Sequence, residues 1–514
     1  MKVIFFYQRF ENLGIEYLSA CLKKYGHQTS LIFDPQLFIN YTLPNKALSK
    51  ALNFRENLLE ETVRARPGLV CFSCASDQFG WALQLAEAVK KILNVPIVFG
   101  GPHPTAVPEN VIKHKCIDFV IVGEGEESLV ELVNSLEDGK DVTNIRNLWC
   151  RVNDRPISNP LRPLISDLDS LPFPDKDLYY IDRKEFFNTF HGFNNTYAVM
   201  GSRGCPKTCS YCQNSYLKKL YKGSKYLRYR SAPNIIRELA IAKQKYGVKT
   251  IVFWDDILTY NKEWLRELLE RYKKEICLPF TCFSYPDRID KETIALLEDA
   301  GCRVMNFGFQ SISENIRKNV LLRYDSNDDI IKAITLISRS RILLFADLIV
   351  GLPTETVEDL LNTAEFFNKN KVNLINIYWL RYLPKTEITK YIENKEFLNE
   401  INEGVIYGPF QAGGSSFDKD KAKLAYLIII ANFIPRSIFK FLLKTKLYRF
   451  FSSKNPYYMV VSLSLALTNM VFRKKYIIPQ LPVFLSFLRY HKYYISKFLS
   501  EKLRRLAGKS LAHS

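Results

Sequence analysis

Three cysteines lie close together in the run G-C-P-K-T-C-S-Y-C, which spans residues 204–212. Cys205, Cys209 and Cys212 have the spacing C-x3-C-x2-C. Three thiolates can bind three irons of a 4Fe–4S cluster and leave the fourth iron without a protein ligand. An iron with an open position can bind and activate a substrate, whereas a cluster with four cysteine ligands mainly transfers electrons. The run therefore predicts a catalytic iron–sulfur site with these cysteines as metal ligands.

A structural zinc site is the alternative for these cysteines. Zinc in structural sites usually takes four Cys or His ligands in tetrahedral geometry. No further Cys or His pair lies near residues 205–212 at the spacing of a zinc ribbon. We therefore favour a 4Fe–4S cluster over a zinc ion at these three cysteines.

The segment that precedes the cysteines begins a long alternation of apolar strands and amphipathic helices. Within residues 191–390, strands are expected at 196–200, 250–254, 279–284, 304–309, 343–350 and 374–380. Six βα units are too few for a closed eight-stranded barrel. This spacing predicts an open, partial (β/α)6 barrel, TIM-like, with the three cysteines on the loop after its first strand.

Residues 1–140 show the same alternation, with strands expected at 2–7, 28–33, 69–73, 96–100 and 119–122. Short apolar strands separated by helices predict a parallel sheet covered on both faces, a Rossmann-like domain. Ligands of such sheets bind at the carboxyl ends of the strands. The residues expected to bind a ligand there are Ser73, Gly100, Gly101, His103, Gly123 and Glu124.

Gly100 and Gly101 lack a Cβ and would let a flat ligand approach the backbone closely. An ordinary βα turn without a ligand is the alternative. The loop is not G-x-G-x-x-G, so a nicotinamide dinucleotide site is disfavoured. Residues 141–190 predict a connector, which contains a hairpin at 147–157 and a proline-rich, semi-rigid stretch at 159–174.

Composition indicates a globular protein of several domains. The chain has 514 residues, of which 47% are hydrophobic and 24% charged, and its 11 cysteines are too sparse for a disulfide scaffold. The apolar start at residues 1–7 reads as a strand rather than a signal peptide. These features predict a cytoplasmic protein.

The net charge of +19 is concentrated at the carboxyl end. Residues 415–514 contain 19 Lys and Arg against 3 Asp and Glu, a net +16, so the remainder carries +3. Residues 391–514 therefore form a basic region, with helices expected at 424–434, 457–472 and 476–488.

Apolar helices flanked by Lys and Arg and interspersed with Tyr and Phe favour peripheral contact of residues 415–514 with the inner face of a membrane. The longest charge-free run, 455–472, is 18 residues and contains several polar side chains, whereas a spanning helix needs ~20 mostly apolar residues. A soluble helical cap over the barrel is the alternative. A nucleic-acid surface ranks lower, because the apolar runs are too long for a surface that follows phosphates.

Further motifs follow one another in a recognisable order. They are N-L-G-I-E-Y-L at 12–18, G-G-P-H-P-T at 100–105, V-G-E-G-E at 122–126, the cysteine run, R-Y-R-S at 228–231, F-W-D-D at 253–256 and V-G-L-P-T-E-T at 350–356. With these motifs, residues 1–390 resemble the cobalamin-binding radical S-adenosylmethionine (SAM) enzymes. The resemblance is to the subgroup of the anaerobic magnesium-protoporphyrin IX monomethyl ester cyclase and of cobalamin-dependent radical SAM methyltransferases.

The resemblance implies roles for individual residues. Cys205, Cys209 and Cys212 would bind the cluster, whose open iron SAM chelates. Tyr211 would lie near adenine, Asp255 and Asp256 near the amino end of SAM, Gln310 and Ser311 near its ribose or carboxylate, and Gly351 in the adenine pocket. One electron from the cluster would cleave SAM to a 5′-deoxyadenosyl radical.

Two features depart from the family pattern. Many relatives have Gly-x-Glu-Ser where this chain has Gln310, which keeps an acceptor but loses the charge that pairs with an ammonium group. No histidine lies in a D-x-H-x-x-G motif, so the usual cobalt ligand is absent. His103 lies in a proline-rich turn, where a structural role is the more common one.

The resemblance implies a methyl transfer to an unactivated carbon, with cobalamin as methyl carrier. The expected partners are a hydrophobic substrate (a lipid, isoprenoid or tetrapyrrole) and a reducing protein such as flavodoxin or ferredoxin. A radical oxidative cyclisation or rearrangement is the alternative. A non-catalytic cobalamin or SAM sensor is disfavoured, because a binding protein has no need of an open iron.

Overall fold

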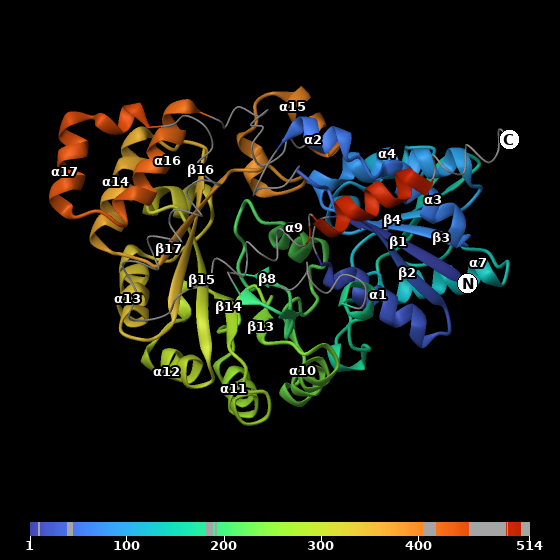
Figure 1. Cartoon of the computed structure of the whole chain (residues 1–514), viewed down its shortest axis with the longest axis horizontal. Coiled ribbons are helices and arrows are strands. Elements are labelled where there is room, and N and C mark those ends of the chain that lie inside the picture. Colours follow the sequence, from blue (N-terminus) through green and yellow to red (C-terminus); the bar gives the residue numbers. More distant parts are fainter. Residues whose placement is uncertain are drawn as a thin grey trace.

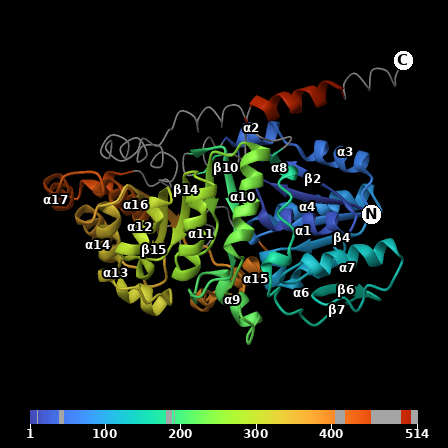
Figure 2. The same ribbon diagram turned by 90° about the horizontal axis from the view of Figure 1, so that it is seen from below.

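The computed structural model describes residues 1–8, 11–38, 45–180, 189–190, 193–404, 418–451, 490 and 492–504. Two α/β units lie side by side, and carboxyl-terminal helices pack against each of them (Figure 1). A second view shows the same division, with the amino-terminal unit on the right (Figure 2). The predicted α/β class with two units is confirmed.

The amino-terminal unit contains a seven-stranded sheet of order β2-β1-β3-β4-β5-β6-β7. Its strands are β1 (Lys2–Gln8), β2 (Gln28–Asp34), β3 (Leu69–Ser73), β4 (Ile97–Gly100), β5 (Phe119–Ile121), β6 (Leu148–Val152) and β7 (Arg155–Ser158). The first five are parallel, and β6 and β7 add the predicted hairpin in antiparallel orientation. The strand order reverses between β1 and β3, which places a ligand crevice at their carboxyl ends.

Helices connect these strands and pack in pairs, α1 beside α7 and α3 beside α4. Their bounds are α1 (Leu13–Lys24), α2 (Lys46–Ala51), α3 (Arg55–Ala65), α4 (Ser76–Ile92), α5 (Pro102–Ala106), α6 (Pro108–Ile112) and α7 (Glu126–Glu137). α3 begins at Arg55, whose amide donates a hydrogen bond to the side chain of Asn53 (2.9 Å).

The second unit is an open barrel of six parallel strands in the order β10-β13-β14-β15-β16-β17. The strands are β10 (Thr196–Val199), β13 (Thr250–Phe253), β14 (Phe280–Ser284), β15 (Cys302–Gln310), β16 (Leu343–Val350) and β17 (Leu374–Trp379). β10 and β17 are edge strands that do not pair with each other. The partial (β/α)6 barrel is therefore confirmed.

The helices of the barrel lie outside the strands in Figure 1. They are α10 (Ala232–Tyr246), α11 (Lys262–Glu275), α12 (Lys291–Asp299), α13 (Asn327–Ser338) and α14 (Val357–Lys369), with α9 (Gln213–Leu220) beyond the cysteine run. Short elements complete this part: α8 (Asp177–Tyr180), β8 (Thr189–Phe190), β9 (Phe193–Asn194), β11 (Ser202–Arg203), β12 (Arg228–Tyr229), η1 (Leu168–Ser170), η2 (Pro286–Arg288), η3 (Ile316–Val320) and η4 (Glu387–Tyr391).

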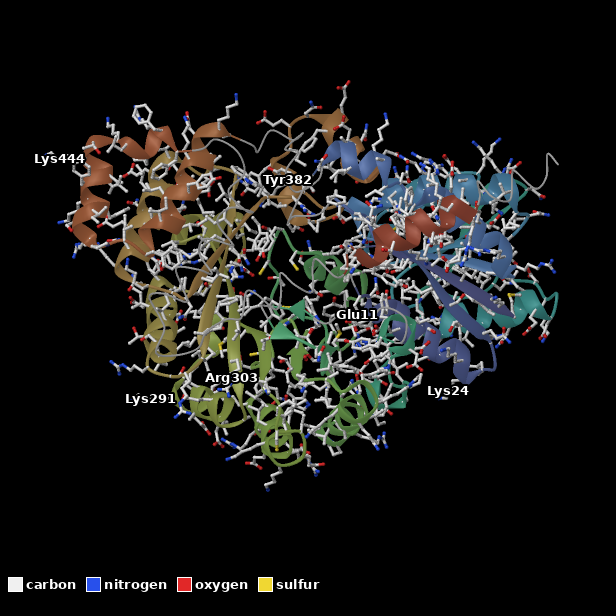
Figure 3. The ribbon with its side chains drawn as sticks, in the orientation of Figure 1. Glu11, Lys24, Lys291, Arg303, Tyr382 and Lys444 are labelled. Carbon is white, nitrogen blue, oxygen red and sulfur yellow. The ribbon has the colours of Figure 1, made fainter. Side chains whose placement is uncertain are left out.

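A buried lysine of the connector joins the two units. Lys176 forms ion pairs with Glu11 and with Glu16 of α1 (2.9 Å for Glu16), and it donates to the carbonyl oxygen of Ala198 in β10 (2.9 Å). Glu11 lies at the junction of the units in Figure 3. Because Lys176 and Glu16 are fully buried, loss of the Lys176 charge would leave the Glu16 carboxylate without a cation in a dry interior.

The carboxyl-terminal region contains α15 (Lys395–Asn402), α16 (Lys419–Ala431), α17 (Arg436–Thr445), η5 (Leu447–Phe450) and a helix over 492–504. α16 packs on α14 of the barrel. The last helix packs on the amino-terminal unit, where Tyr494 contacts Phe54 and Tyr490 donates to the carbonyl of Pro35 (2.7 Å). No helix within the described ranges is long and apolar enough to cross a membrane. The expected helices at 457–472 and 476–488 lie outside the described residues.

Candidate functional site

The cysteine run forms a loop between β11 and α9 at the carboxyl end of β10. Cys209 is buried, while Cys205 and Cys212 are half-buried. Ser210 fixes the loop, because its amide donates to Leu321 O (2.9 Å), its hydroxyl donates to Val320 O (2.6 Å) and its carbonyl accepts from the Ile388 amide (3.0 Å). The loop is therefore held from two sides before any cofactor binds.

Burial raises the pKa of the Cys205 thiol to about 12 and that of Cys212 to about 11, and the nearby carboxylate of Asp256 adds to both shifts. Within the described ranges, no group of three or more His, Cys, Asp or Glu side chains is arranged to hold a metal ion. The donors offered by the loop are three soft sulfurs, which suit a cluster in which each thiolate binds a different iron. Binding there would release protons, because the ligands must be thiolates.

The two aspartates after β13 have different environments. Asp255 is fully buried and accepts hydrogen bonds from the Gly201 amide (3.0 Å) and the Ser202 hydroxyl. Burial raises its pKa to about 6. Asp256 accepts from Asn214 (3.1 Å) and lies close enough to Cys205 and Cys212 to influence their pKa values. Asp255 thus supports the loop, and Asp256 is the aspartate that faces the cysteines.

Tyr211, between the second and third cysteine, contacts an arginine that sequence reasoning missed. Nη1 of Arg323 lies 3.4 Å from the Tyr211 hydroxyl, and its guanidinium lies 4.1 Å from the ring centroid of Tyr285. Arg323 is buried, and its Nη2 has no hydrogen-bond partner among the described residues. Its charge pairs with buried Asp325 (3.4 Å), so the free Nη2 donor suits one acceptor atom of a ligand beside the cysteine loop.

Gln310, Ser311 and Gly351 lie at the carboxyl ends of β15 and β16, as predicted. The Gln310 side chain folds over Gly308, where an added Cβ would lie 2.1 Å from its Nε2. The Ser311 carbonyl accepts from Arg317 (2.7 Å). Gly351 has φ +81° and its amide donates to Glu355 (2.8 Å).

The concave face of the barrel carries a polar row. Asn306 of β15 and Asn376 of β17 both donate to the carboxylate of Asp347 on β16 (2.7 and 2.8 Å). The apolar cluster of Val304, Leu343, Phe345 and Leu374 closes the barrel on the amino-terminal side of this row. Because side chains alternate along β17, Tyr378 lies on the same face as Asn376, two residues nearer the carboxyl end of the strand. At the carboxyl ends of the strands, Trp254 stacks on Phe283 with 5.3 Å between the ring centroids.

A cavity of about 260 Å³ lies at the carboxyl edge of the amino-terminal sheet. Five of the six residues predicted there line it, namely Ser73, Gly100, Gly101, Gly123 and Glu124. Apolar side chains of α1 and α7 form its wall, and Met200 and Arg203 from the loop after β10 complete it. The cavity is therefore shared between the two units.

Two glycines of the cavity lining lie against neighbouring segments of the protein where a side chain has no room. Gly101 has φ +97°, and an added Cβ would lie 2.9 Å from the backbone nitrogen of Cys74. Gly123 has φ +80°, and its added Cβ would meet the Tyr221 hydroxyl at 1.7 Å. Both positions need glycine for conformation and for space. A largely apolar crevice lined by bare backbone fits a flat, bulky group such as the nucleotide part of a corrinoid.

Glu124 lines the cavity, but its carboxylate is already paired within the protein. Arg203 of β11 and Arg228 of β12, which are opposite each other on a two-stranded ribbon, both pair with its carboxylate (3.1 and 2.9 Å). The Ile165 amide donates to the same carboxylate (2.9 Å). Burial opposes ionisation, but these donors outweigh it and hold the Glu124 pKa below its usual value.

His103 is the predicted residue that the structure does not bring to the cavity. Its Nδ1 lies 3.0 Å from the Ser76 hydroxyl, and its ring packs at 4.5 Å on Phe79. Burial lowers its pKa to about 4, so the ring is neutral. Cys74, the neighbouring thiol, is also buried outside the cavity lining.

Sequence reasoning assigned no role to Met200, Arg203, Tyr221, Arg228 or Arg323. The sequence does contain features that point to two of these residues. Arg203 is two residues before Cys205, and Arg228 is the first residue of the R-Y-R-S motif. Nothing in the sequence pairs Arg323 with Tyr211, which are 112 residues apart.

Comparison with known proteins agrees with this geometry. Residues 199–367 match the family model of the radical SAM superfamily, and residues 3–133 match that of the B12 binding domain. An uncharacterized methyltransferase from Pyrococcus horikoshii is 30% identical over 393 residues, which cover 76% of this chain and 80% of the relative. The anaerobic magnesium-protoporphyrin IX monomethyl ester cyclase from Cereibacter sphaeroides is 24% identical over 413 residues, which cover 75% of this chain and 62% of the cyclase.

Two solved structures share the fold. The radical SAM methyltransferase TsrM from Kitasatospora setae, with cobalamin and a 4Fe–4S cluster bound, has a TM-score of 0.60 at 16% identity and covers 75% of this chain and 76% of its own. The cobalamin-dependent radical SAM enzyme OxsB has a TM-score of 0.55 at 15% identity and covers 78% of this chain and 56% of its own.

Proposed function

Because this chain belongs to the radical SAM enzymes that carry a B12-binding domain, we propose that it methylates an unactivated carbon of a hydrophobic substrate. The cofactors of such an enzyme are a 4Fe–4S cluster, SAM and cobalamin. When bound, the cluster supplies the electron for cleavage of SAM, and cobalamin carries the methyl group.

The observation that carries this proposal is the shared cavity. Gly101 and Gly123 at the sheet edge and Arg203 of the cysteine-bearing unit line one space, and Arg203 is two residues before Cys205. A corrinoid held there would therefore lie beside the cluster loop. Methyl transfer needs this proximity, because both cofactors must reach the same substrate carbon.

The chain's own residues would position the reactants. Cys205, Cys209 and Cys212 would hold the cluster, and Asp256 would face the amino group of SAM. Gln310 and Ser311 would lie along the ribose or carboxylate side, with Gly351 and Tyr211 by the adenine. The Arg323 guanidinium offers an unpaired donor beside Tyr211.

The barrel interior supports a substrate with a flat or apolar body. Trp254 and Tyr378 are each about two-fifths exposed on its open side (40% and 41%), and aromatic rings are large apolar contact surfaces. The polar row of Asp347 and its two asparagines lies beneath them and could bind one polar substituent. A lipid, an isoprenoid or a tetrapyrrole fits this description, and flavodoxin or ferredoxin would supply electrons.

An oxidative cyclisation is the second candidate, favoured by the likeness to a relative that is named as a cyclase. The two reactions differ in their products. Methylation by this route yields S-adenosylhomocysteine and 5′-deoxyadenosine together. Cyclisation yields 5′-deoxyadenosine without an equivalent amount of S-adenosylhomocysteine.

The experiment begins with protein that is made and purified without oxygen in the presence of cobalamin. We expect about four irons, equivalent sulfide and one corrinoid per chain. Incubation with SAM, reductant and candidate lipids or tetrapyrroles should then give both SAM products and a substrate heavier by one CH₂. Protein that contains four irons but no corrinoid would rule out methyl transfer through cobalamin. Consumption of the substrate with formation of 5′-deoxyadenosine alone would favour cyclisation.

A further inference from the structure

Four apolar side chains are exposed together on α17 and η5. We name Ile438, Phe441, Leu447 and Phe450 the α17 patch. Phe441 is 56% exposed and Phe450 85%, although another side of the helix packs inward through buried Phe439. Single exposed apolar residues are common, but four within 13 residues of the chain concentrate an unusual amount of apolar surface in water.

The charges that α17 and η5 themselves carry are all positive, while Glu365 of α14 and Asp420 of α16 are the acidic side chains of neighbouring helices that interact with them. Arg436, Lys440, Lys444 and Arg449 lie on the same two elements, which contain no Asp or Glu, and Lys446 lies between them. The sequence has no acidic residue between Lys421 and Ser500 and has fourteen Lys and Arg there. Whatever binds the patch must therefore offer both an apolar phase and negative charge.

The patch is also at an extremity of the molecule. α17 lies at the end farthest from the amino-terminal unit in both views (Figures 1 and 2). Figure 3 shows Lys444 at the outer edge of this helix. A flat surface could approach α17 without meeting the amino-terminal unit.

We propose that the α17 patch inserts into the interface of an anionic lipid bilayer, with the surrounding Lys and Arg on the headgroups. Short amphipathic helices bind membranes in this way, through apolar insertion together with electrostatic attraction. RNA would satisfy the charges but leave Ile438 and Leu447 in water. A protein partner would need an acidic rim around an apolar centre, whereas an anionic bilayer has both features everywhere. This surface is separate from the cofactor sites, so its failure would leave the proposed reaction untouched.

The test is co-sedimentation of the full chain with vesicles of phosphatidylcholine that contain about one-quarter phosphatidylglycerol. One variant, Phe441→Ser with Phe450→Ser, removes apolar contact. A second, Lys440→Gln with Lys444→Gln, removes charge. Matched controls are Tyr25→Ser with Ile92→Ser, which are exposed apolar residues elsewhere, and Lys24→Gln with Lys291→Gln, which lie at other edges of the molecule (Figure 3).

We expect binding to anionic vesicles that falls as salt is raised, and weak binding to phosphatidylcholine alone. A lysine near an anionic surface is worth roughly five-fold in partition, so the charge variant should bind at least tenfold more weakly. The apolar variant should lose a comparable amount, and both controls should bind like the parent protein.

Three results would overturn the proposal. The first is no binding to anionic vesicles, or equal binding by patch variants and controls. The second is retention of an RNA probe that the patch variants lose while vesicle binding is absent, which would assign the surface to RNA. The third is a lower Tm of the apolar variant with unchanged vesicle binding, which would mean that another segment of the chain covers the patch.

Discussion

Nη1 of Arg203 lies 3.1 Å from Oε1 of Glu124, and this pair joins the two units at the cofactor site. Glu124 lies three residues beyond the end of β5, and Arg203 is two residues before Cys205. Any movement of the cluster loop away from the cavity would therefore separate two charges that are only slightly exposed to water (17% and 18%).

Replacement of Glu124 by Gln should weaken this contact between the two units. The variant keeps one acceptor but leaves buried Arg228 without its anion, while Arg203 keeps its ion pair with Glu126 (2.6 Å). We therefore expect a loss of about 2–4 kcal/mol of stability and lower corrinoid content. Thermal unfolding and corrinoid absorbance measure the two effects. The control is Glu127→Gln, an exposed partner of Arg162 (61% side-chain exposure), which should cost less than about 0.5 kcal/mol. Equal behaviour of the two variants would refute the positioning role.

The cysteine loop can be tested by replacing Cys205, Cys209 and Cys212 together with Ala. Without thiolate ligands the cluster has no protein anchor, so iron and sulfide should be absent and deoxyadenosine formation abolished. Corrinoid should still bind, because the cavity lies outside this loop's thiols. Exposed Cys277 provides a control as Cys277→Ser, which should keep four irons and full cleavage. Persistent SAM cleavage in the triple variant would rule out radical initiation at this site.

Gly123→Ala should disturb the cavity through contact rather than through backbone strain alone. Its Cβ would lie 1.7 Å from the Tyr221 hydroxyl, so Tyr221 must move towards the crevice or away from it. We expect corrinoid retention to fall about tenfold, since ~1.4 kcal/mol is easily lost to one forced side-chain movement. Gly139→Ala is the control, because Gly139 also has positive φ (+65°) but has nothing within 4 Å of its added Cβ.

The double variant Gly123→Ala with Tyr221→Ala distinguishes the contact with Tyr221 from backbone strain as the cause of the loss. Removal of the tyrosine ring should restore part of the corrinoid retention. If the double variant is no better than Gly123→Ala, the loss comes from the backbone and not from the tyrosine.

Stability should depend on pH through Glu355. Burial raises its pKa to about 7, although the Gly351 amide and Lys421 oppose that rise. Because the folded state binds this proton more tightly than the unfolded state, its stabilising effect is full below about pH 4.5 and is lost as pH rises through 7. The Tm of the native protein should therefore fall from pH 5 to pH 8 by more than that of Glu355→Gln, whose amide does not titrate. Parallel Tm curves for the two proteins would contradict this assignment.

The sequence by itself determined the architecture and the cysteine site. Hydrophobic periodicity predicts both sets of parallel strands, because burial on two faces demands apolar runs of strand length. The C-x3-C-x2-C spacing predicts the cluster loop, because its ligands are adjacent in the chain. Ser73, Gly100, Gly101, Gly123 and Glu124 were found because the carboxyl ends of parallel strands always share one edge.

Tertiary structure alone decided which of these residues share a cavity and which support it. Asp255 and Asp256 are adjacent in sequence, yet one holds the backbone of Gly201 and the other faces the thiols. His103 lies in the same motif as Gly101 but packs on Phe79 outside the cavity. Arg203, Arg228 and Glu124 meet although 79 to 104 residues separate the arginines from the carboxylate. Such pairs depend on how the two units pack together, and side-chain direction at the surface between them leaves no periodic signal in the chain.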